Sequence, residues 1–152
     1  MAQRIDDQEF PIPALLRQAR GSYGRAIAQR LAQEGFDDVP ANGPFVLGGL
    51  ARDASSVAFT EGLGVSKQAV SQLLDTLVLR GYLTRDIDPA DRRRMVLGLT
   101  DRGTAAAAAV RDAVATVDAE LSAMISPAEL AGLRAGLTAL GKIKRDRDAV
   151  RR

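Results

Sequence analysis

One segment in the middle of the chain carries amide, hydroxyl and ammonium groups at a spacing that suits contact with nucleic-acid bases. Ser66 precedes a predicted helix, and the face of this helix opposite its leucines carries Lys67, Gln68, Ser71, Gln72 and Asp75. Gln can form two hydrogen bonds with adenine, Ser can contact either kind of base, and Lys can reach guanine or a phosphate. A solvated polar helix face has the same composition, so this segment alone leaves both interpretations open.

A second segment places a run of arginines on a loop between two predicted strands. The loop extends from Asp86 to Arg94, and it carries Arg92, Arg93 and Arg94. Arginine side chains in a narrow A·T-rich minor groove meet an enhanced negative potential. Most arginine runs are solvated charge clusters, but the position of this one beside the polar helix favours contact with DNA. The carboxylates of Asp88 and Asp91 are expected to hold an arginine fork in place by a bidentate bond.

The composition limits the chemistry that is available. The 152 residues include no Cys and no His, and 21 basic residues against 19 acidic ones give a net charge of only +2. Disulfides, thiol switches, thiolate or imidazole metal sites and His-based general-base mechanisms are therefore excluded. There is also no glycine-rich phosphate loop, so we expect neither an enzyme nor a bound cofactor. The small net charge says little about nucleic acid, and that argument depends on where the charges lie.

The length and the first residues indicate a cytoplasmic protein. A chain of 152 residues suits one domain with a core, together with an oligomerisation element. The N-terminal sequence MAQRIDDQEF is polar and lacks the apolar core of a signal peptide. No run of about 18 apolar residues is present, so no segment is expected to span a membrane.

Besides the helix at residues 12–31, three helices are predicted to precede the arginine loop. They cover residues 45–52, a short stretch from Ser55–Ser56 to Glu61, and residues 67–80. Gly64 suits the sharp turn before the last of these helices, because Gly tolerates a positive φ. Val65 is expected to point into the small core. The Ser66 side chain is expected to cap the helix that follows it.

The end of the third helix leads into a predicted hairpin. Gly81 is expected to end the helix as its C′ residue, with Tyr82 as the hydrophobic residue after it. Two β segments follow, at residues 83–85 and 95–99, and the arginine loop joins them. Thr100 is then expected to cap a long helix.

Long apolar seams lie on both sides of this centre. They run through residues 12–31, 107–124 and 130–143 at steps of three and four residues. The third seam follows Ser126-Pro127, which reads as an N-cap and N1, and the charged tail beyond Lys142 is expected to fray. Because a small central domain could not cover all three, we favour a helical interface between two copies over packing within one chain.

The middle of the chain resembles the MarR family of bacterial regulators. The resemblance rests on four stretches, at residues 63–67, 77–83, 88–94 and 97–103, and it includes the DPxDRR and LTxxG motifs. It implies a mainly α, winged helix-turn-helix fold with a two-stranded β wing and with N- and C-terminal dimerisation helices. The implied regions are an N-terminal dimerisation helix and loop at 1–44, a DNA-binding lobe at 45–104, and C-terminal dimerisation helices at 105–152.

The resemblance also implies a function. Members of this family are homodimers that bind pseudo-palindromic operators on double-stranded DNA, usually as repressors that a small molecule releases. The stretch from Ser66 to Gln72 would face the major groove, Asp91 with Arg93 would form a wing pair, and Arg92 and Arg94 would make further contacts. The chain departs from the family pattern at Thr60, where a small Ala is preferred, and at Gly62, which weakens a helix.

The effector is less constrained by the sequence. The resemblance implies a ligand crevice, and the aromatic residues expected there are Tyr23, Phe36, Phe45 and Phe59. The absence of Cys rules out the thiol-based peroxide sensors of the family, and the absence of His argues against its zinc sensors. Two alternatives stay open: a constitutive or architectural DNA-binding protein without an effector, and a dimeric winged-helix module that binds proteins instead of DNA.

Overall fold

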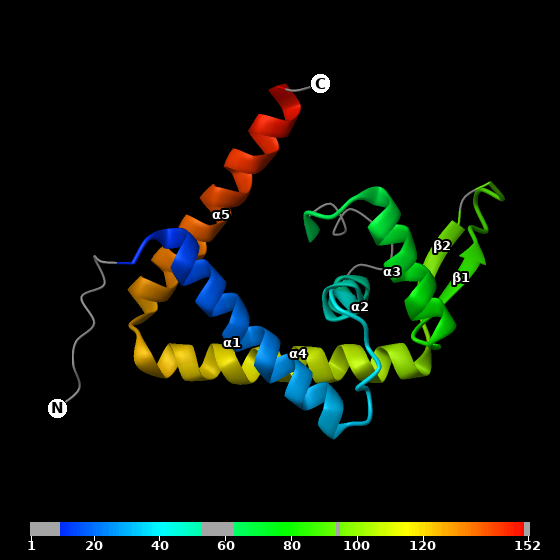
Figure 1. Cartoon of the computed structure of the whole chain (residues 1–152), viewed down its shortest axis with the longest axis horizontal. Helices are drawn as coiled ribbons and strands as arrows, with labels where there is room; N and C mark the ends of the chain where they lie inside the picture. Colours follow the sequence, from blue (N-terminus) through cyan, green and yellow to red (C-terminus); the bar gives the residue numbers. More distant parts are fainter. Residues whose placement is uncertain (1–9, 53–62, 94, 151–152) are drawn as a thin grey trace. The chain divides into compact units, whose positions relative to one another are not determined.

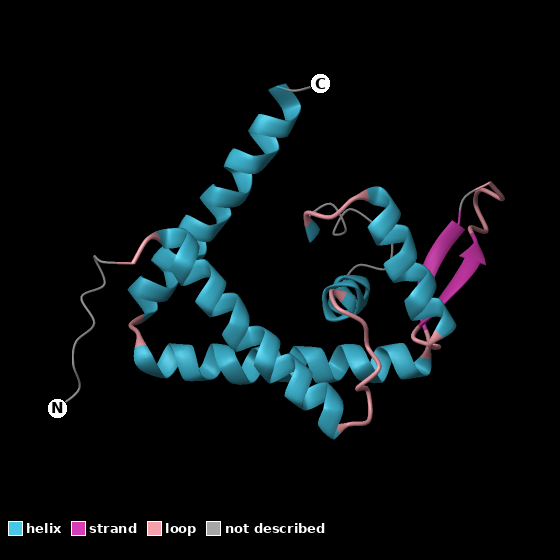
Figure 2. Cartoon of the chain, in the orientation of Figure 1, coloured by secondary structure: helices cyan, strands magenta, loops and turns pink. Residues whose placement is uncertain are grey.

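The structure is a computed structural model, and it describes residues 10–52, 63–93 and 95–150 (Figure 1). These residues form five α-helices and one two-stranded antiparallel sheet (Figure 2). The elements in chain order are α1 (Ile12–Gln33), α2 (Gly43–Arg52), α3 (Lys67–Leu79), β1 (Leu83–Ile87), β2 (Met95–Leu99), α4 (Asp101–Met124) and α5 (Pro127–Val150). The mainly α fold with a two-stranded wing is thus confirmed. The short helix expected from Ser55–Ser56 to Glu61, with Thr60 and Gly62, lies outside the described residues.

The chain divides into two compact units, one up to Ala115 and one from Thr116 onward. The first unit holds α1, α2, α3, the hairpin and the first half of α4, and it contains the core. The second unit holds the rest of α4 and α5. The division by role at residues 44 and 104 concerns function, and it stays a prediction.

The helix boundaries around α3 follow from the residues that the sequence places there. The Ser66 hydroxyl accepts a hydrogen bond from the N–H of Ala69 at 3.2 Å, and Gly64 has a φ of +67°. At the other end, Gly81 has a φ of +75°, and the N–H of Tyr82 reaches back to the carbonyl of Leu77 at 2.9 Å. This is a Schellman ending. Both expected ends of the helix are confirmed.

The last two helices also begin at the expected residues. The Thr100 hydroxyl accepts a hydrogen bond from the N–H of Gly103 at 2.9 Å. Ser126 and Glu129 form a reciprocal capping box, in which the N–H of Ser126 lies 2.8 Å from the Glu129 carboxylate. The helix α5 continues to Val150, and the expected fraying of the charged tail beyond Lys142 stays a prediction.

The core of the first unit forms where α2, α3, the hairpin and the first half of α4 meet. Its most buried members are Val46, Leu47, Leu77, Tyr82 and Ala106, each with 0% exposure. Four further residues of α4 are buried with them: Ala107, Ala109, Val110 and Ala113. The first half of the 107–124 seam therefore packs within one chain, because small alanines let the other elements approach α4 closely.

The hairpin pairs β1 with β2 in a single antiparallel ladder, with Leu83 opposite Leu99 and Ile87 opposite Met95. Its first strand extends two residues further than residues 83–85. The start of β1 is buried and its outer residues are exposed, so the sheet is anchored at its base and projects as a wing (Figure 2). None of the helices in the described ranges has the length and apolar character that crossing a membrane requires.

Candidate nucleic-acid interface and ligand cavity

The polar face of α3 is exposed, and its apolar face is anchored in the core. Leu74 and Leu77 are buried at 8% and 0% exposure. The residues predicted to face DNA are all exposed: Ser66, Lys67, Gln68, Ser71 and Gln72. The prediction that Val65 points into the core is wrong, since this side chain is 41% exposed. It lies in the turn between Gly64 and the cap Ser66, ahead of the first turn of the helix.

The wing tip presents arginines on a turn that two carboxylates shape. Arg92 and Arg93 are exposed, while Arg94 lies outside the described residues. The Asp88 carboxylate accepts a hydrogen bond from the N–H of Ala90 at 2.9 Å, and the Asp91 carboxylate accepts one from the N–H of Arg93 at 3.0 Å. Asp91 therefore contacts the backbone of Arg93, where a bidentate bond to a guanidinium was expected. Short Asp side chains favour such local contacts.

An ion pair joins α3 to the first strand of the wing. The guanidinium of Arg85 on β1 lies 2.6 Å from the carboxylate of Asp75 on α3. Both side chains are partly exposed, so we expect a small contribution to stability. The pair instead orients α3 and the wing, which carry the residues predicted to contact DNA. The sequence places Asp75 on the polar face of the helix, but nothing in it identifies Arg85 as the partner.

A cluster of three residues ties the loop after α1 to the base of the wing. The hydroxyl of the buried Tyr82 donates to the carboxylate of Asp38, and the Arg102 guanidinium lies 2.8 Å from the same oxygen. This guanidinium also stacks over the Tyr82 ring at 4.6 Å from its centroid. The side chain of Arg80, at the end of α3, donates to the backbone carbonyl of Asp38.

These contacts shift the proton affinities of the cluster in opposite directions. The hydrogen bond from Tyr82, with a smaller contribution from the Arg102 charge, lowers the pKa of Asp38 below its usual 3.8. Burial of the ring, followed by the hydrogen bond to Asp38, raises the pKa of Tyr82 above its usual 10.0. The cluster is therefore a neutral phenol held by a charged carboxylate and a charged guanidinium at neutral pH.

Thr100 and Gly103 of the LTxxG motif contact the backbone at the end of α3. The Thr100 hydroxyl donates to the carbonyl of Gly81 at 2.6 Å, and its backbone N–H lies 3.1 Å from the carbonyl of Tyr82. A Cβ placed on Gly103 would lie 2.0 Å from this same Tyr82 carbonyl oxygen. Only glycine allows α4 to start so close to the end of α3. The motif thus holds the end of α3, the base of the wing and the start of α4 together.

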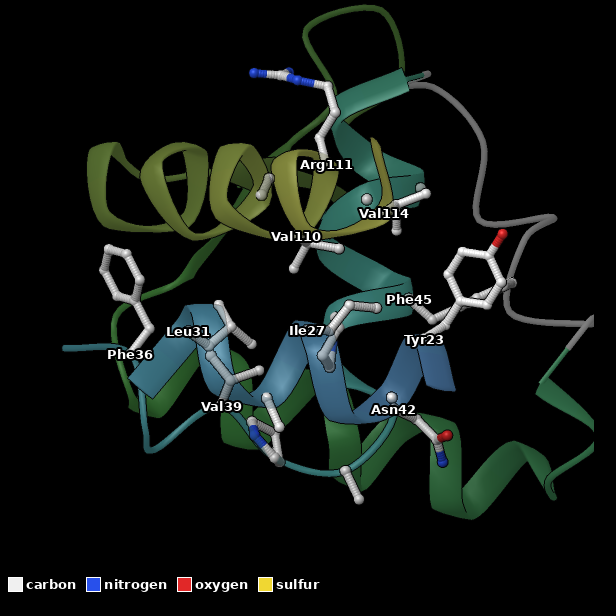
Figure 3. A pocket seen from close by; sticks show the side chains of 18 of the residues that line it. Tyr23, Ile27, Leu31, Phe36, Val39, Asn42, Phe45, Val110, Arg111 and Val114 are labelled. Atoms are coloured by element: carbon white, nitrogen blue, oxygen red, sulfur yellow. The ribbon is translucent and has the colours of Figure 1, made fainter. Parts of the chain in front are cut away.

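A cavity of about 1330 Å³ lies between α1, α2, the loop that joins them, and the part of α4 before Ala115 (Figure 3). Three of the predicted ligand residues line it: Tyr23, Phe36 and Phe45. The fourth, Phe59, lies outside the described residues. Much of the remaining wall is apolar, with Ile27, Leu31, Val39, Val110 and Val114.

The polar groups of the cavity are few. Arg20, Asp37, Asn42, Arg52 and Arg111 contribute to its lining, and Figure 3 shows the Arg111 side chain pointing away from the labelled apolar residues. The cavity is also close to the junction described above. The ring of Phe36, which lines it, packs edge-on against Tyr82 with 6.2 Å between centroids. An apolar molecule in the cavity would thus contact Phe36, which packs against Tyr82 just after the end of α3.

Comparisons with known proteins agree with this architecture. Residues 46–94 match the family model described as "MarR family". The chain is 35% identical over 95 residues to a protein of Thauera aromatica described as "Putative transcriptional regulatory protein for hcr operon", and the match covers 62% of this chain and 52% of that protein. The chain thus spans about half the length of its curated relative.

Solved structures show the same fold over nearly their whole length. The MepR–DNA complex of S. aureus superposes with a TM-score of 0.71 at 24% identity, covering 88% of this chain and 98% of MepR. The reduced form of MarR from E. coli gives a TM-score of 0.64 at 25% identity, covering 86% and 96%. With a winged fold and a DPxDRR wing, the chain resembles the MarR family, whose model matches residues 46–94.

Proposed function

We propose that this protein is a DNA-binding transcriptional regulator. It acts by binding and not by catalysis, as expected from its resemblance to a family of transcriptional regulators. The observation that carries the proposal is the exposed N-terminal half of α3, which lies beside a cationic wing and is held to it by the Asp75–Arg85 ion pair. Both elements present donors on the outside while their apolar sides are fixed in one core. A rigid pair of this kind can meet a groove and its flanking phosphates together.

The two elements have different tasks in this proposal. The N-terminal turns of α3 enter the major groove, where Gln68 and Gln72 can pair with adenine and Ser71 can contact either base type. Arg92 and Arg93 at the wing tip meet the adjacent backbone or a narrow minor groove. Arg94 belongs to the same cationic run. The relative MepR has been solved as a DNA complex, and this likeness of fold supports the same docking here.

The regulator is proposed to act as a homodimer on a pseudo-palindromic operator. Along α5, one stripe of large apolar side chains is exposed: Leu133, Leu137, Leu140 and Ile143. The start of α1 adds Ile12, Leu15 and Leu16, which are also exposed. Such stripes are unfavourable in water, and a second copy of the chain would cover them. Two copies would place two α3 helices on successive turns of DNA.

A small molecule is proposed to release this regulator, which would make it a repressor. The cavity between α1, α2 and α4 has the size and the apolar lining of a ligand site. Its wall includes Phe36 and Asp37, and the adjacent Asp38 is bonded to Tyr82 and Arg80 at the end of α3. A ligand that displaces this loop would therefore move the end of the helix that contacts DNA.

A footprint of the purified protein on the DNA upstream of its own gene tests the proposal. We expect protection of two half-sites whose centres lie about 34 Å apart, one helical turn, or a multiple of it. The variant Arg92→Ala/Arg93→Ala should lose the protection, and Arg17→Ala, which removes an exposed arginine from α1, should keep it. Absence of protection and of measurable DNA affinity at low salt would contradict the proposal and favour a protein-binding module.

A further inference from the structure

Three glycines of α1 and α2 line the cavity, Gly24, Gly48 and Gly49, and two of them, Gly24 and Gly48, lie in the middle of lining rows. On α1 the lining residues include Arg20, Gly24 and Ala28, which are spaced by four and share one side of the helix. On α2 the same spacing connects Pro44, Gly48 and Arg52. Side chains at positions 24 and 48 would therefore project from the faces that border the cavity.

Gly24 is exposed and Gly48 is half-buried, and neither lies against another side chain. A Cβ added at Gly24 or Gly48 would meet no atom within 4 Å in the described structure. Two other glycines of the same unit are close to neighbouring atoms, because a Cβ at Gly43 would lie 2.7 Å from the Val39 side chain, and one at Gly103 would lie 2.0 Å from a backbone oxygen. Close packing thus explains Gly43 and Gly103 but does not explain Gly24 and Gly48.

Backbone conformation does not explain them either. The glycines with positive φ are Gly35, Gly64 and Gly81, each at a turn, whereas Gly24 and Gly48 lie inside helices. Glycine in a helix interior is the least favourable residue apart from proline. Each of the two therefore weakens its own helix without making a contact that needs the missing side chain. What the pair does provide is open volume along the parts of the cavity wall that α1 and α2 form.

We propose that Gly24 and Gly48 set the size of the ligand that the cavity admits. The inference rests on the proposed role of this cavity as an effector site, and it specifies the effector as a bulky, mainly apolar molecule. The volume of about 1330 Å³ exceeds the usual range of roughly 300–1,000 Å³ for ligand pockets. Ile27, Leu31 and Val110 supply apolar contacts around the space that the glycines leave.

The test places side chains into this space in the full-length protein. The variants are Gly24→Leu and Gly48→Leu, with Gly24→Ala and Gly48→Ala as smaller steps. Gly21→Leu is the matched control, because Gly21 lies on α1, is not among the described lining residues, and has its nearest atom, on Arg25, at 3.5 Å from an added Cβ. The probe is the multi-ring fluorophore 1-anilinonaphthalene-8-sulfonate, titrated into each protein. The exposed stripe on α5 is the same in all variants, so any binding there is a constant background.

The inference predicts a graded loss. Each Leu variant should bind the probe at least about tenfold more weakly than the parent, which equals about 1.4 kcal/mol. The Ala variants should lose less, and Gly21→Leu should bind as the parent does. The melting temperatures of the Ala variants should be equal to or higher than that of the parent, because Ala favours helix over Gly.

Three results would overturn the inference. The first is that both Leu variants bind the probe as tightly as the parent does. This would also be the result if the parent bound the probe only at the exposed stripe of α5. The second is a lower melting temperature in the Ala variants, because the glycines would then be required by the fold. The third is a changed oligomeric mass, because they would then pack against a second copy. DNA affinity, measured separately by fluorescence anisotropy, reports on the proposed regulator function, so failure there leaves the cavity result intact.

Discussion

At the residue scale, Arg93 and Gln68 are both exposed on neighbouring elements, but their contacts with DNA should differ in kind. We expect Arg93→Ala to weaken binding to operator and to non-specific DNA together, because a wing arginine neutralises phosphate charge. The slope of log affinity against log salt should fall by about one unit per half-site. Gln68→Ala should instead lose about 1–3 kcal/mol of discrimination between operator and scrambled DNA and leave the slope unchanged.

The measurement is a set of anisotropy titrations at several salt concentrations, on the footprinted operator and on a scrambled duplex. Gln72→Ala serves as a second helix variant, since Gln72 is exposed on the same face one turn further along. If Gln68→Ala changes the salt slope as much as Arg93→Ala does, the assignment of base contacts to α3 and phosphate contacts to the wing is wrong.

Asp91 separates the effect of charge from the effect of geometry at the same wing. Removing a carboxylate near DNA should strengthen binding if charge alone mattered. We expect Asp91→Ala to weaken binding several-fold, because its carboxylate holds the backbone N–H of Arg93 at 3.0 Å and so shapes the turn. That bond is worth about 1 kcal/mol. Binding is measured on the operator by anisotropy.

The matched control for Asp91 is Asp86→Ala. Asp86 lies on β1 and carries the same charge, and its carboxylate accepts a hydrogen bond from the Thr84 hydroxyl instead of from the wing turn. This variant should bind DNA as tightly as the parent or slightly more tightly. An Asp91→Ala protein that gains affinity to the same extent as Asp86→Ala would show that charge alone governs the wing.

At the element scale, the Asp38–Tyr82–Arg102 cluster joins the loop after α1 to the wing base and to α4. The pKa of Tyr82 is raised above 10, chiefly by burial. The folded protein thus holds the phenolic proton more tightly than the unfolded chain does. The resulting stability is complete below about pH 10 and is lost as the pH rises through the folded pKa. Tyr82→Phe should lower the free energy of unfolding by about 1 kcal/mol at neutral pH and remove this alkaline decrease.

Urea unfolding of parent and variant between neutral pH and pH 11 measures both effects. Tyr23→Phe, which changes the other of the two tyrosines, should keep the alkaline decrease. An equally steep decrease in Tyr82→Phe and in the parent would assign it to groups outside the cluster.

The elements also show what the sequence can predict. The caps at Ser66 and Ser126 and the helix end at Gly81 were predictable, because each depends on residues within one or two turns. The contacts of Asp38 with Tyr82 and Arg102 were not, because they join residues 44 and 64 positions apart and no local pattern marks the partners. The same holds for Asp75 and Arg85. The role of Gly103 was visible as part of a motif, but its reason is a backbone approach that appears only in the fold.

At the scale of the whole molecule, helical periodicity could not tell packing within one chain from packing between two. The seam of α4 and the stripe of α5 have the same spacing of apolar residues. Ala107 and Val110 are buried in the core of the first unit, whereas Met124 is 81% exposed. Along α5, none of the residues from 127 to 143 is buried. An apolar stripe without cover in its own chain is the surface on which a second copy is expected.

This stripe gives the last prediction. Leu137 is 43% exposed in its middle, and Leu137→Glu should place a charge in the proposed interface, where an unpaired carboxylate is strongly unfavourable. We expect the mass in solution to change from that of two chains to that of one at micromolar concentration. The affinity for a two-half-site operator should fall by about 100-fold or more, because each half-site would be bound independently. Light scattering and anisotropy measure the two effects.

Thr138→Glu is the control, since Thr138 is exposed on α5, outside the stripe, and this variant should remain a dimer with parental DNA affinity. If Leu137→Glu keeps the mass of two chains, or if the parent is already a monomer, α5 is not the dimer interface.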